Sequence, residues 1–290
     1  MSHDNYHETS AIANQHICFY GAGSMAEAIA RGLLNQELVP FKQISMLNRS
    51  NKERQHQLHL QYGVQTVLQG KSNEQYLQAA NIIILAMKPK DAVEAIRALK
   101  PLLSPNQLII SVIAGLSITA IESLIGSNMA IVRTMPNTSS TIGLGATGIS
   151  YSASVSEEQR FMTETMFESI GIHVVVEEQL QDAVTSVSGS GPAYFYYVME
   201  AMMKGAQQAG LSAEQAKLLV VQTALGAASM VDATGEAPAD LRLKVSSPNG
   251  TTEAAIKTMA EGHLEATIIA GMKRCAQRAQ EIGKSIEEDI

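Results

Sequence analysis

The sequence predicts an α/β Rossmann domain, with a doubly wound and mostly parallel sheet, followed by an all-α domain. Two observations lead to this prediction. Strand and helix patterns alternate along the first part of the chain, which is typical of a doubly wound sheet. After about Gln181 the strand pattern ends and only helical patterns follow. We therefore expect a short mobile tail over residues 1–15, the Rossmann domain over 16–180 and the helical domain over 181–290.

The expected strands are short apolar runs that end in polar or glycine-containing turns. One run, NIIILAM, is unbroken, as expected of a parallel strand that is covered on both faces. The strands are expected at His16–Tyr20, Ile44–Leu47, Asn81–Met87, Gln107–Ile113, Ala130–Met135, Ala146–Ser150 and His173–Glu177. Helices are expected between them, at Lys52–Tyr62, Asp91–Leu99 and Ser117–Ile125, after the turn at Gly21, and from a capping box at Ser156 and Gln159 to Gly171.

The second domain is expected to be an all-α body of about 110 residues. Pro192 suits the first position of a helix that runs to Gly210. A capping box at Ser212 and Gln215 opens the next helix, which ends near Gly235. A short helix over Ala239–Lys244 and two further helices complete the chain. Because the long helices are apolar over more than one face, we expect part of their surface to pack against another subunit.

Composition limits the partners of the chain. Of 290 residues, 46% are hydrophobic and 17% are charged, which predicts a soluble globular protein. A net charge of −7 without a long basic run argues against nucleic acid or an anionic membrane as partner. The two cysteines and seven histidines form no metal motif. With no signal peptide and no apolar stretch of roughly 20 residues, we expect a cytoplasmic protein without a membrane span.

A glycine-rich turn predicts a dinucleotide site. The letters GAGSMA at residues 21–26 fit the pattern G-x-G-x-x-A. The first glycine permits a tight turn after the strand, the second lets a pyrophosphate approach the backbone, and the alanine lets the helix pack on the strand. The helix N-terminus adds oriented N–H groups and partial positive charge. The pattern follows a first strand and opens a helix, which is the context that supports this interpretation.

The ends of the second and third strands indicate which cofactor binds. Proteins that bind NAD usually carry Asp or Glu at the end of the second strand, where it accepts hydrogen bonds from the ribose. This sequence has Asn48, Arg49 and Ser50 there, which can bind a 2′-phosphate instead, so NADPH is favoured and NADH remains an alternative. Met87 and Lys88 end the third strand, at the edge where ligands bind in open sheets.

The remaining polar residues form no catalytic group. No Ser-His-Asp or Cys-His arrangement is present, so covalent catalysis is unsupported and the cofactor is expected to carry the chemistry. Glu177, Glu178 and Asp182 are interpreted as a solvated linker. A late loop, VSSPNGTTEAA at residues 245–255, interrupts the helical pattern with small hydroxyls and Asn-Gly. The loop precedes a helix expected to start near Thr252, so it is suited to hold an anion.

These motifs together resemble those of the pyrroline-5-carboxylate reductase family. GAGSMAEAIARGL is similar to the cofactor turn of the family, and AMKP is similar to its usual A-V-K-P. RTMPNT follows the family's R-x-M-P-N-T-P, with Ser139 in place of the last proline. DAVT, SGSGPAY and VSSPNGTTEAAI follow in family order, with Asn249 where glycine is common. The resemblance extends from His16 to the last helix.

The resemblance implies reduction of 1-pyrroline-5-carboxylate with NAD(P)H, the last step of proline synthesis. It also implies helices that interleave in a homodimer, or in larger rings such as decamers, with an active site formed in part by the partner. The implied cofactor contacts are Gly21, Gly23, Ser24, Met25, Asn48, Arg49, Met87, Lys88 and Ala114. The implied substrate contacts are Ser247, Gly250, Thr251 and Thr252, and the Thr252 hydroxyl is the expected catalytic group. No metal is implied.

Two other interpretations stay open at this stage. An NADP-dependent reductase of the β-hydroxyacid dehydrogenase type would share both domains, but it needs a helical lysine beside a glycine-rich stretch. Lys204 and Lys217 lack that setting. A non-catalytic NADP-binding sensor or scaffold is the second alternative. The threonines of the late loop could likewise be simple N-caps of the following helix.

Overall fold

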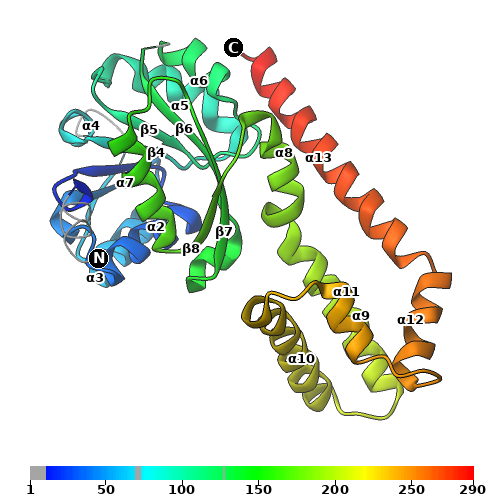
Figure 1. Ribbon diagram of the computed structural model, residues 1–290. Helices are drawn as coiled ribbons and strands as arrows, with labels where there is room; N and C mark the ends of the chain where they lie inside the picture. Colours follow the sequence, from blue (N-terminus) through cyan, green and yellow to red (C-terminus); the bar gives the residue numbers. More distant parts are fainter. Residues whose placement is uncertain (1–10, 69–72, 127) are drawn as a thin grey trace, which may run out of the picture. The chain divides into compact units, whose positions relative to one another are not determined.

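A computed structural model of the chain describes residues 11–68, 73–126 and 128–290 (Figure 1). By contact the chain divides into two compact units, of which the second is Gly191–Arg274 and the first contains the preceding residues together with Cys275–Ile290. The sequence-based boundary between residues 180 and 181 stays a prediction. The expected tail falls mostly outside the described residues, and its described end packs into the core through the fully buried Ile12.

The first unit is built on an eight-stranded sheet with the order β3-β2-β1-β4-β5-β6-β7-β8. Neighbouring strands are parallel except β6 and β7, which confirms the predicted doubly wound, mostly parallel sheet. The chain order reverses between β1 and β4. The strands are β1 (Ile17–Tyr20), β2 (Ile44–Asn48), β3 (Gln65–Leu68), β4 (Ile82–Leu85), β5 (Leu108–Ser111), β6 (Ala130–Met135), β7 (Gly145–Tyr151) and β8 (Gly171–Val175).

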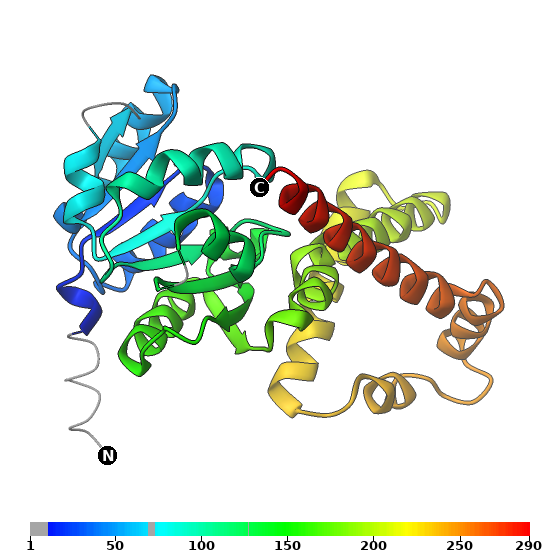
Figure 2. The same cartoon turned by 90° about the horizontal axis from the view of Figure 1, so that it is seen from above.

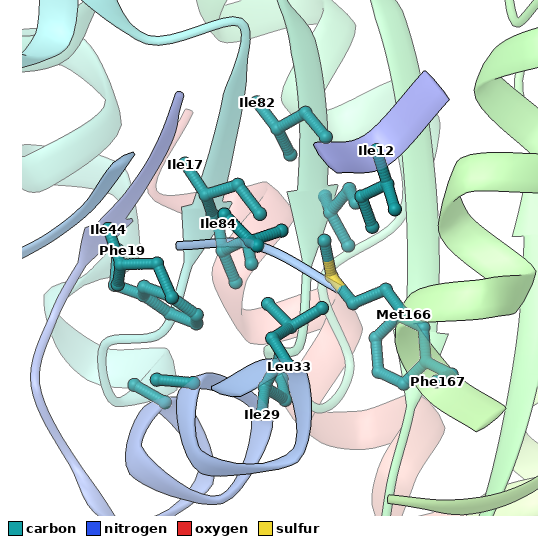
Figure 3. Close-up of a cluster of buried hydrophobic side chains, with 14 of the residues drawn as sticks. Ile12, Ile17, Phe19, Ile29, Leu33, Ile44, Ile82, Ile84, Met166 and Phe167 are labelled. Atoms are coloured by element: carbon teal, nitrogen blue, oxygen red, sulfur yellow. The ribbon is translucent and has the colours of Figure 1, made fainter. Parts of the chain in front are cut away.

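Helices cover both faces of this sheet (Figure 2). On one face Ile29 and Leu33 of α2 and Phe167 of α7 meet Ile17 and Ile84 of the sheet (Figure 3). On the other face α5 and α6 pack against the alternate side chains of the same strands. The helices of the first unit include α2 (Ser24–Asn35), α3 (Lys52–Tyr62), α4 (Glu74–Ala79), α5 (Ala92–Leu99), α6 (Ile118–Ile125) and α7 (Glu157–Glu168).

Sequence patterns missed β3 and α4, and they assigned Gly171 wrongly. β3 is an edge strand of partly exposed residues, and α4 buries only Leu77, so neither has a clear hydrophobic pattern. The capping box at Ser156 and Gln159 is confirmed, but its helix ends before Gly171. Gly171 instead opens β8 with φ +148°, and a Cβ on it would lie 2.0 Å from the Gly145 carbonyl oxygen. The absence of a side chain at Gly171 lets β7 and β8 pair closely at this position.

The second unit is entirely helical in its described structure, as predicted. Its helices are α9 (Gly191–Gln208), α10 (Ala213–Thr234), α11 (Pro238–Lys244) and α12 (Thr251–Glu261), and α13 (Leu264–Glu288) begins in it. Large apolar side chains on these helices are exposed, among them Tyr197 at 74% and Leu218 at 71%. By length and composition α10 could cross a membrane, which corrects the expectation that no such stretch exists.

The end of α13 returns to the first unit. Ile286 is buried in the same apolar cluster as α5 and α6, and Ile282 packs against it. Arg97 of α5 donates to the Ile290 carbonyl at 2.7 Å, and Ser117 donates to the Glu287 carboxylate at 2.9 Å. The last residues of the chain are therefore part of the Rossmann unit, although they follow the helical domain in sequence.

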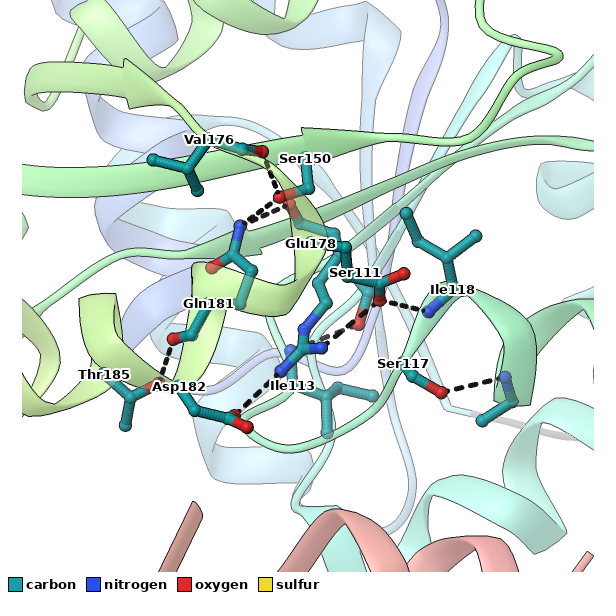
Figure 4. A network of polar contacts seen from close by, with 12 residues as sticks. Ser111, Ile113, Ser117, Ile118, Ser150, Val176, Glu178, Gln181, Asp182 and Thr185 are labelled. Atoms are coloured by element: carbon teal, nitrogen blue, oxygen red, sulfur yellow. Dashed lines mark hydrogen bonds and ion pairs between the residues drawn. The ribbon is translucent and has the colours of Figure 1, made fainter. Parts of the chain in front are cut away.

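A buried guanidinium joins β6 to the segment that leaves the sheet (Figure 4). Arg133 pairs with Glu178 at 3.2 Å and with Asp182 at 3.4 Å, and its side chain is only 10% exposed. Glu178 also accepts the Ile118 backbone N–H at 2.7 Å. The interpretation of Glu178 and Asp182 as a solvated linker is therefore wrong. The two carboxylates anchor α8 (Gln181–Val184), which leads into a π-helical turn at Thr185–Gly189.

We predict that Arg133→Met lowers the free energy of unfolding by about 2–4 kcal/mol, because it leaves two carboxylates together without their cation. Urea denaturation followed by circular dichroism measures the loss. Arg278→Met is the control, since Arg278 pairs with Glu281 on the surface and is 63% exposed. This control should cost less than about 1 kcal/mol. Equal losses in the two variants would contradict the structural role of Arg133.

Candidate functional site

The glycine-rich turn lies at the carboxyl edge of the sheet, between β1 and α2. Gly21 has φ +120°, and a Cβ placed on it would lie 2.4 Å from the Ala86 carbonyl oxygen. Its N–H donates to the Leu47 carbonyl at 3.1 Å. Gly23 is the N-cap of α2, and a Cβ there would meet nothing within 4 Å. The fold therefore requires the first glycine, whereas the second leaves open space in front of the helix.

The first turn of α2 carries donors suited to a pyrophosphate. Ser24 and Met25 are its first residues, and the opening N–H groups of a helix have no intrahelical acceptor. In the described part of the chain no side chain caps this helix. The combination of open space at Gly23 and uncapped N–H groups fits the phosphates of a dinucleotide.

Side chains from α3 hold the glycine turn in place. Arg54 donates through Nε to the Ala22 carbonyl at 3.2 Å, and its guanidinium pairs with Glu27 of α2. Tyr62 donates its hydroxyl to the same carboxylate at 2.8 Å. Burial raises the pKa of Glu27, but the hydrogen bonds from Arg54 and Tyr62 outweigh this effect and hold the pKa below its usual value. The carboxylate thus stays ionised and tied to α3.

Five of the expected cofactor residues line one cleft of about 510 Å³. The cleft lies where the chain order reverses, between β1 and β4, which is the usual ligand position in open α/β sheets. The register places Tyr20 beside both Leu47 and Leu85, so the segments that follow these strands converge. The five residues are Gly21, Asn48, Arg49, Met87 and Lys88.

The other expected cofactor residues are not in the lining of this cleft. Gly23, Ser24 and Met25 are at the start of α2, and Ala114 is half-buried in the turn after β5. The structure thus brings together part of the predicted set. The roles of all nine residues stay predictions.

Sequence reasoning missed three charged residues of the cleft. Lys90, Asp91 and Glu94 line it from the segment that follows β4. Arg49 donates through Nη1 to Asp91 Oδ1 at 3.1 Å, so the predicted phosphate ligand has a partner within the cleft. Their position could have been inferred from the sequence, because residues just after a parallel strand lie at the ligand-binding edge.

The late loop joins α11 to α12 in the second unit. α12 begins at Thr251, one residue before the expected start, and its N-cap is Gly250. Asn249 has φ 58°, as expected of a residue that stands in place of glycine. Its N–H donates to the Glu253 carboxylate at 2.6 Å, a contact that sequence reasoning also missed. This contact closes the turn in front of the helix.

One expected donor of the loop is already used. Gly250 is one of the implied substrate contacts, but its N–H already donates to the Ser247 carbonyl at 2.9 Å. The threonines occupy the first two positions of α12, so the interpretation of either as the N-cap is wrong. Their own N–H groups have no intrahelical acceptor. Thr252 is half-buried, while Thr251 and Ser247 are exposed.

We predict that Gly23→Ala weakens NADPH binding at least about tenfold, because a methyl group would occupy the space in front of the α2 donors. The thermal midpoint should hardly change. Gly21→Ala is the contrasting variant, since its Cβ would clash with Ala86 and should destabilise the fold by about 1–3 kcal/mol. Calorimetric titration and thermal unfolding measure the two effects. Normal NADPH affinity in Gly23→Ala would contradict this assignment of the turn.

The doubly wound sheet, the glycine turn at its switch point and the helical second unit define a dinucleotide-dependent oxidoreductase of two units. Residues 16–115 match the family model described as "NADP oxidoreductase coenzyme F420-dependent", and residues 178–282 match "Pyrroline-5-carboxylate reductase dimerisation". Pyrroline-5-carboxylate reductase 1 of Bacillus subtilis (strain 168) is 40% identical over 272 residues, 94% of this chain and 91% of the relative. The chain belongs to the pyrroline-5-carboxylate reductase family.

Solved structures agree with this assignment. The chain is similar to a pyrroline-5-carboxylate reductase from Coxiella burnetii, with a TM-score of 0.85, 35% identity and coverage of 92% of this chain and 98% of that one. It is also similar to Plasmodium falciparum pyrroline carboxylate reductase with NADP bound, with a TM-score of 0.84, 28% identity and coverage of 94% and 99%. The chain is an NAD(P)H-dependent oxidoreductase with a dimerisation domain, which includes the apolar helix α10.

Proposed function

We propose that this chain reduces 1-pyrroline-5-carboxylate to L-proline with NADPH as the favoured hydride donor and NADH as a second one. The observation that carries the proposal is the cleft at the β1/β4 switch point, in a chain of this family. The purified protein should consume NADPH when the cyclic imine is added, as measured by the loss of NADPH absorbance. Turnover of a hydroxy acid in place of the imine would contradict the proposal.

Arg49 is the proposed ligand of the 2′-phosphate. The end of β2 carries Asn48, whose side-chain oxygen accepts the Ser50 and Asn51 N–H groups at 3.1 and 3.0 Å. The amide therefore holds the turn that presents Arg49, and no carboxylate stands at the strand end to receive a ribose hydroxyl. The exposed guanidinium can form charge-assisted hydrogen bonds to a phosphate. Lys88 adds a second positive charge to the lining.

We predict that Arg49→Glu raises the KM for NADPH by about 10- to 100-fold and the KM for NADH by less than about threefold. The reason is that only NADPH carries the 2′-phosphate. Steady-state kinetics with each cofactor measure the effect. Lys42→Glu, with the same charge change at the opposite end of β2, is the control and should alter neither KM. Equal effects of Arg49→Glu on both cofactors would refute the assignment.

The late loop is the proposed substrate site, with Ser247, Gly250, Thr251 and Thr252 as its contacts. The carboxylate of the imine would receive the opening N–H groups of α12, where the helix also offers partial positive charge. Gly250 contributes by closing the turn, because its N–H is bonded to Ser247. The loop thus needs no charged side chain to hold the anion.

The Thr252 hydroxyl is the proposed catalytic group. Bound NADPH supplies a hydride for the C=N carbon of the substrate. A protonated imine needs no further acid, which agrees with a substrate loop whose four proposed contacts include no histidine or carboxylate. Thr252 would accept the hydrogen bond of the ring N–H and orient the ring, and the loop would hold the carboxylate. The protein then has to position the imine carbon against the nicotinamide and to exclude water from the site.

We predict that Thr252→Ala lowers kcat at least about tenfold while the Kd for NADPH stays within about twofold, because the hydroxyl acts on the substrate alone. Thr252→Ser keeps the hydroxyl and should retain most of the activity. Steady-state kinetics and calorimetric titration measure the two quantities. A collapse of NADPH affinity in Thr252→Ala would show that the loop holds the cofactor instead.

The working assembly is proposed to be a homodimer, with a decamer as the larger form. The exposed apolar side chains of α9 and α10 lie within the dimerisation domain, and a second copy of the chain would cover them. We place the enzyme in the cytoplasm, since its cysteines are free thiols. Burial raises the pKa of the Cys18 thiol to about 12, so this residue is an inert core side chain.

A further inference from the structure

The guanidinium proposed for the 2′-phosphate is shared with a carboxylate. Arg49 and Asp91 both line the cofactor cleft, and their side chains meet at 3.1 Å. The pair is open to solvent, with Arg49 70% and Asp91 34% exposed. Ion pairs of this exposure contribute little to stability, so a ligand can open this one at small cost.

A carboxylate at the position of Asp91 would affect the binding of the two cofactors in opposite directions. The 2′-phosphate of NADPH would displace the Asp91 carboxylate from Arg49 and then lie beside it, so like charges repel. NADH presents a hydroxyl at the same place, and a hydroxyl can donate to a carboxylate. In NAD-binding proteins that carboxylate usually stands at the end of the second strand, where this chain has Asn48. Asp91 follows β4, yet it lies within reach of the end of β2.

We propose that Asp91 determines the balance between NADPH and NADH: its carboxylate competes with the 2′-phosphate for Arg49 and receives the ribose hydroxyl of NADH. This inference rests on the proposed function, in which Arg49 holds the 2′-phosphate. It explains how one cleft can accept both cofactors without a carboxylate on the second strand. Asp91 is therefore a specificity-determining residue.

The test is Asp91→Asn, which keeps the size of the side chain and removes its charge. The Kd values for NADPH and NADH are measured by calorimetric titration of the protein without substrate. We expect NADPH to bind about three- to tenfold tighter and NADH to bind about two- to fivefold weaker. The increase in NADPH affinity should be smaller at high ionic strength, because salt screens exposed charges. An unchanged ratio of the two Kd values would overturn the inference.

Two further variants separate the possible causes. Glu94→Gln removes a different carboxylate of the same cleft and should change both Kd values by the same factor. A ratio that shifts as far in Glu94→Gln as in Asp91→Asn would overturn the specific role of Asp91. Arg49→Ala tests whether Arg49 binds the 2′-phosphate, the assignment on which the role of Asp91 rests. If Arg49→Ala weakens NADPH and NADH equally, the 2′-phosphate assignment fails as well. If it weakens only NADPH, an unchanged ratio in Asp91→Asn defeats the present inference alone.

Asp91→Asn should fold normally, because the Asp91 side chain makes no capping hydrogen bond to α5. The thermal midpoint of the variant checks this. Should the amide disturb the turn at Pro89, Asp91→Ser removes the same charge with a smaller side chain, and the same change in the ratio of Kd values is expected.

Discussion

The cofactor cleft depends on one close approach of two backbones, that of Gly21 against Ala86. A side chain at Gly21 would lie 2.4 Å from the Ala86 carbonyl oxygen, so only glycine lets β1 turn into α2 at this point. Because β1 lies between β2 and β4, the turn brings together the segments that follow all three strands. Asn48 and Arg49 reach the cleft from the end of β2, and Met87 reaches it from the segment after β4. Wider spacing of these backbones would separate the groups that a dinucleotide needs together.

The charged side chains of the cleft lining determine how strongly the cleft can bind an anionic ligand. The chain as a whole carries a net charge of −7, yet the lining contains Arg49, Lys88 and Lys90 together with Asp91 and Glu94. Because the lining contains both positive and negative side chains, it could bind NADPH, which carries the 2′-phosphate, as well as NADH, which lacks it. In the predicted role, the backbone donors of α2 would serve either cofactor, because both contain a pyrophosphate. Selectivity thus has to come from the side chains around the ribose rather than from the phosphate-binding turn.

The helical unit contains the family's dimerisation domain and the proposed substrate loop, which the sheet lacks. In the proposed role, the loop before α12 would offer helix N–H groups and the Thr252 hydroxyl to a small carboxylate. The apolar side chains of α9 and α10 are exposed in the single chain, and a family dimerisation domain includes them. A second copy of the chain would cover these side chains and thereby stabilise the unit.

The sequence by itself determined the local features of this protein: the buried strands, the capping boxes, the glycine turn and the hydroxyl-rich loop. These depend on neighbouring residues, so hydrophobic period and turn chemistry were enough to predict them. Only the tertiary structure decided the pairing of Arg49 with Asp91 and the burial of Arg133 between two carboxylates. The ion pairs join residues far apart in the chain, and sheet order and packing, rather than local sequence, bring such residues together.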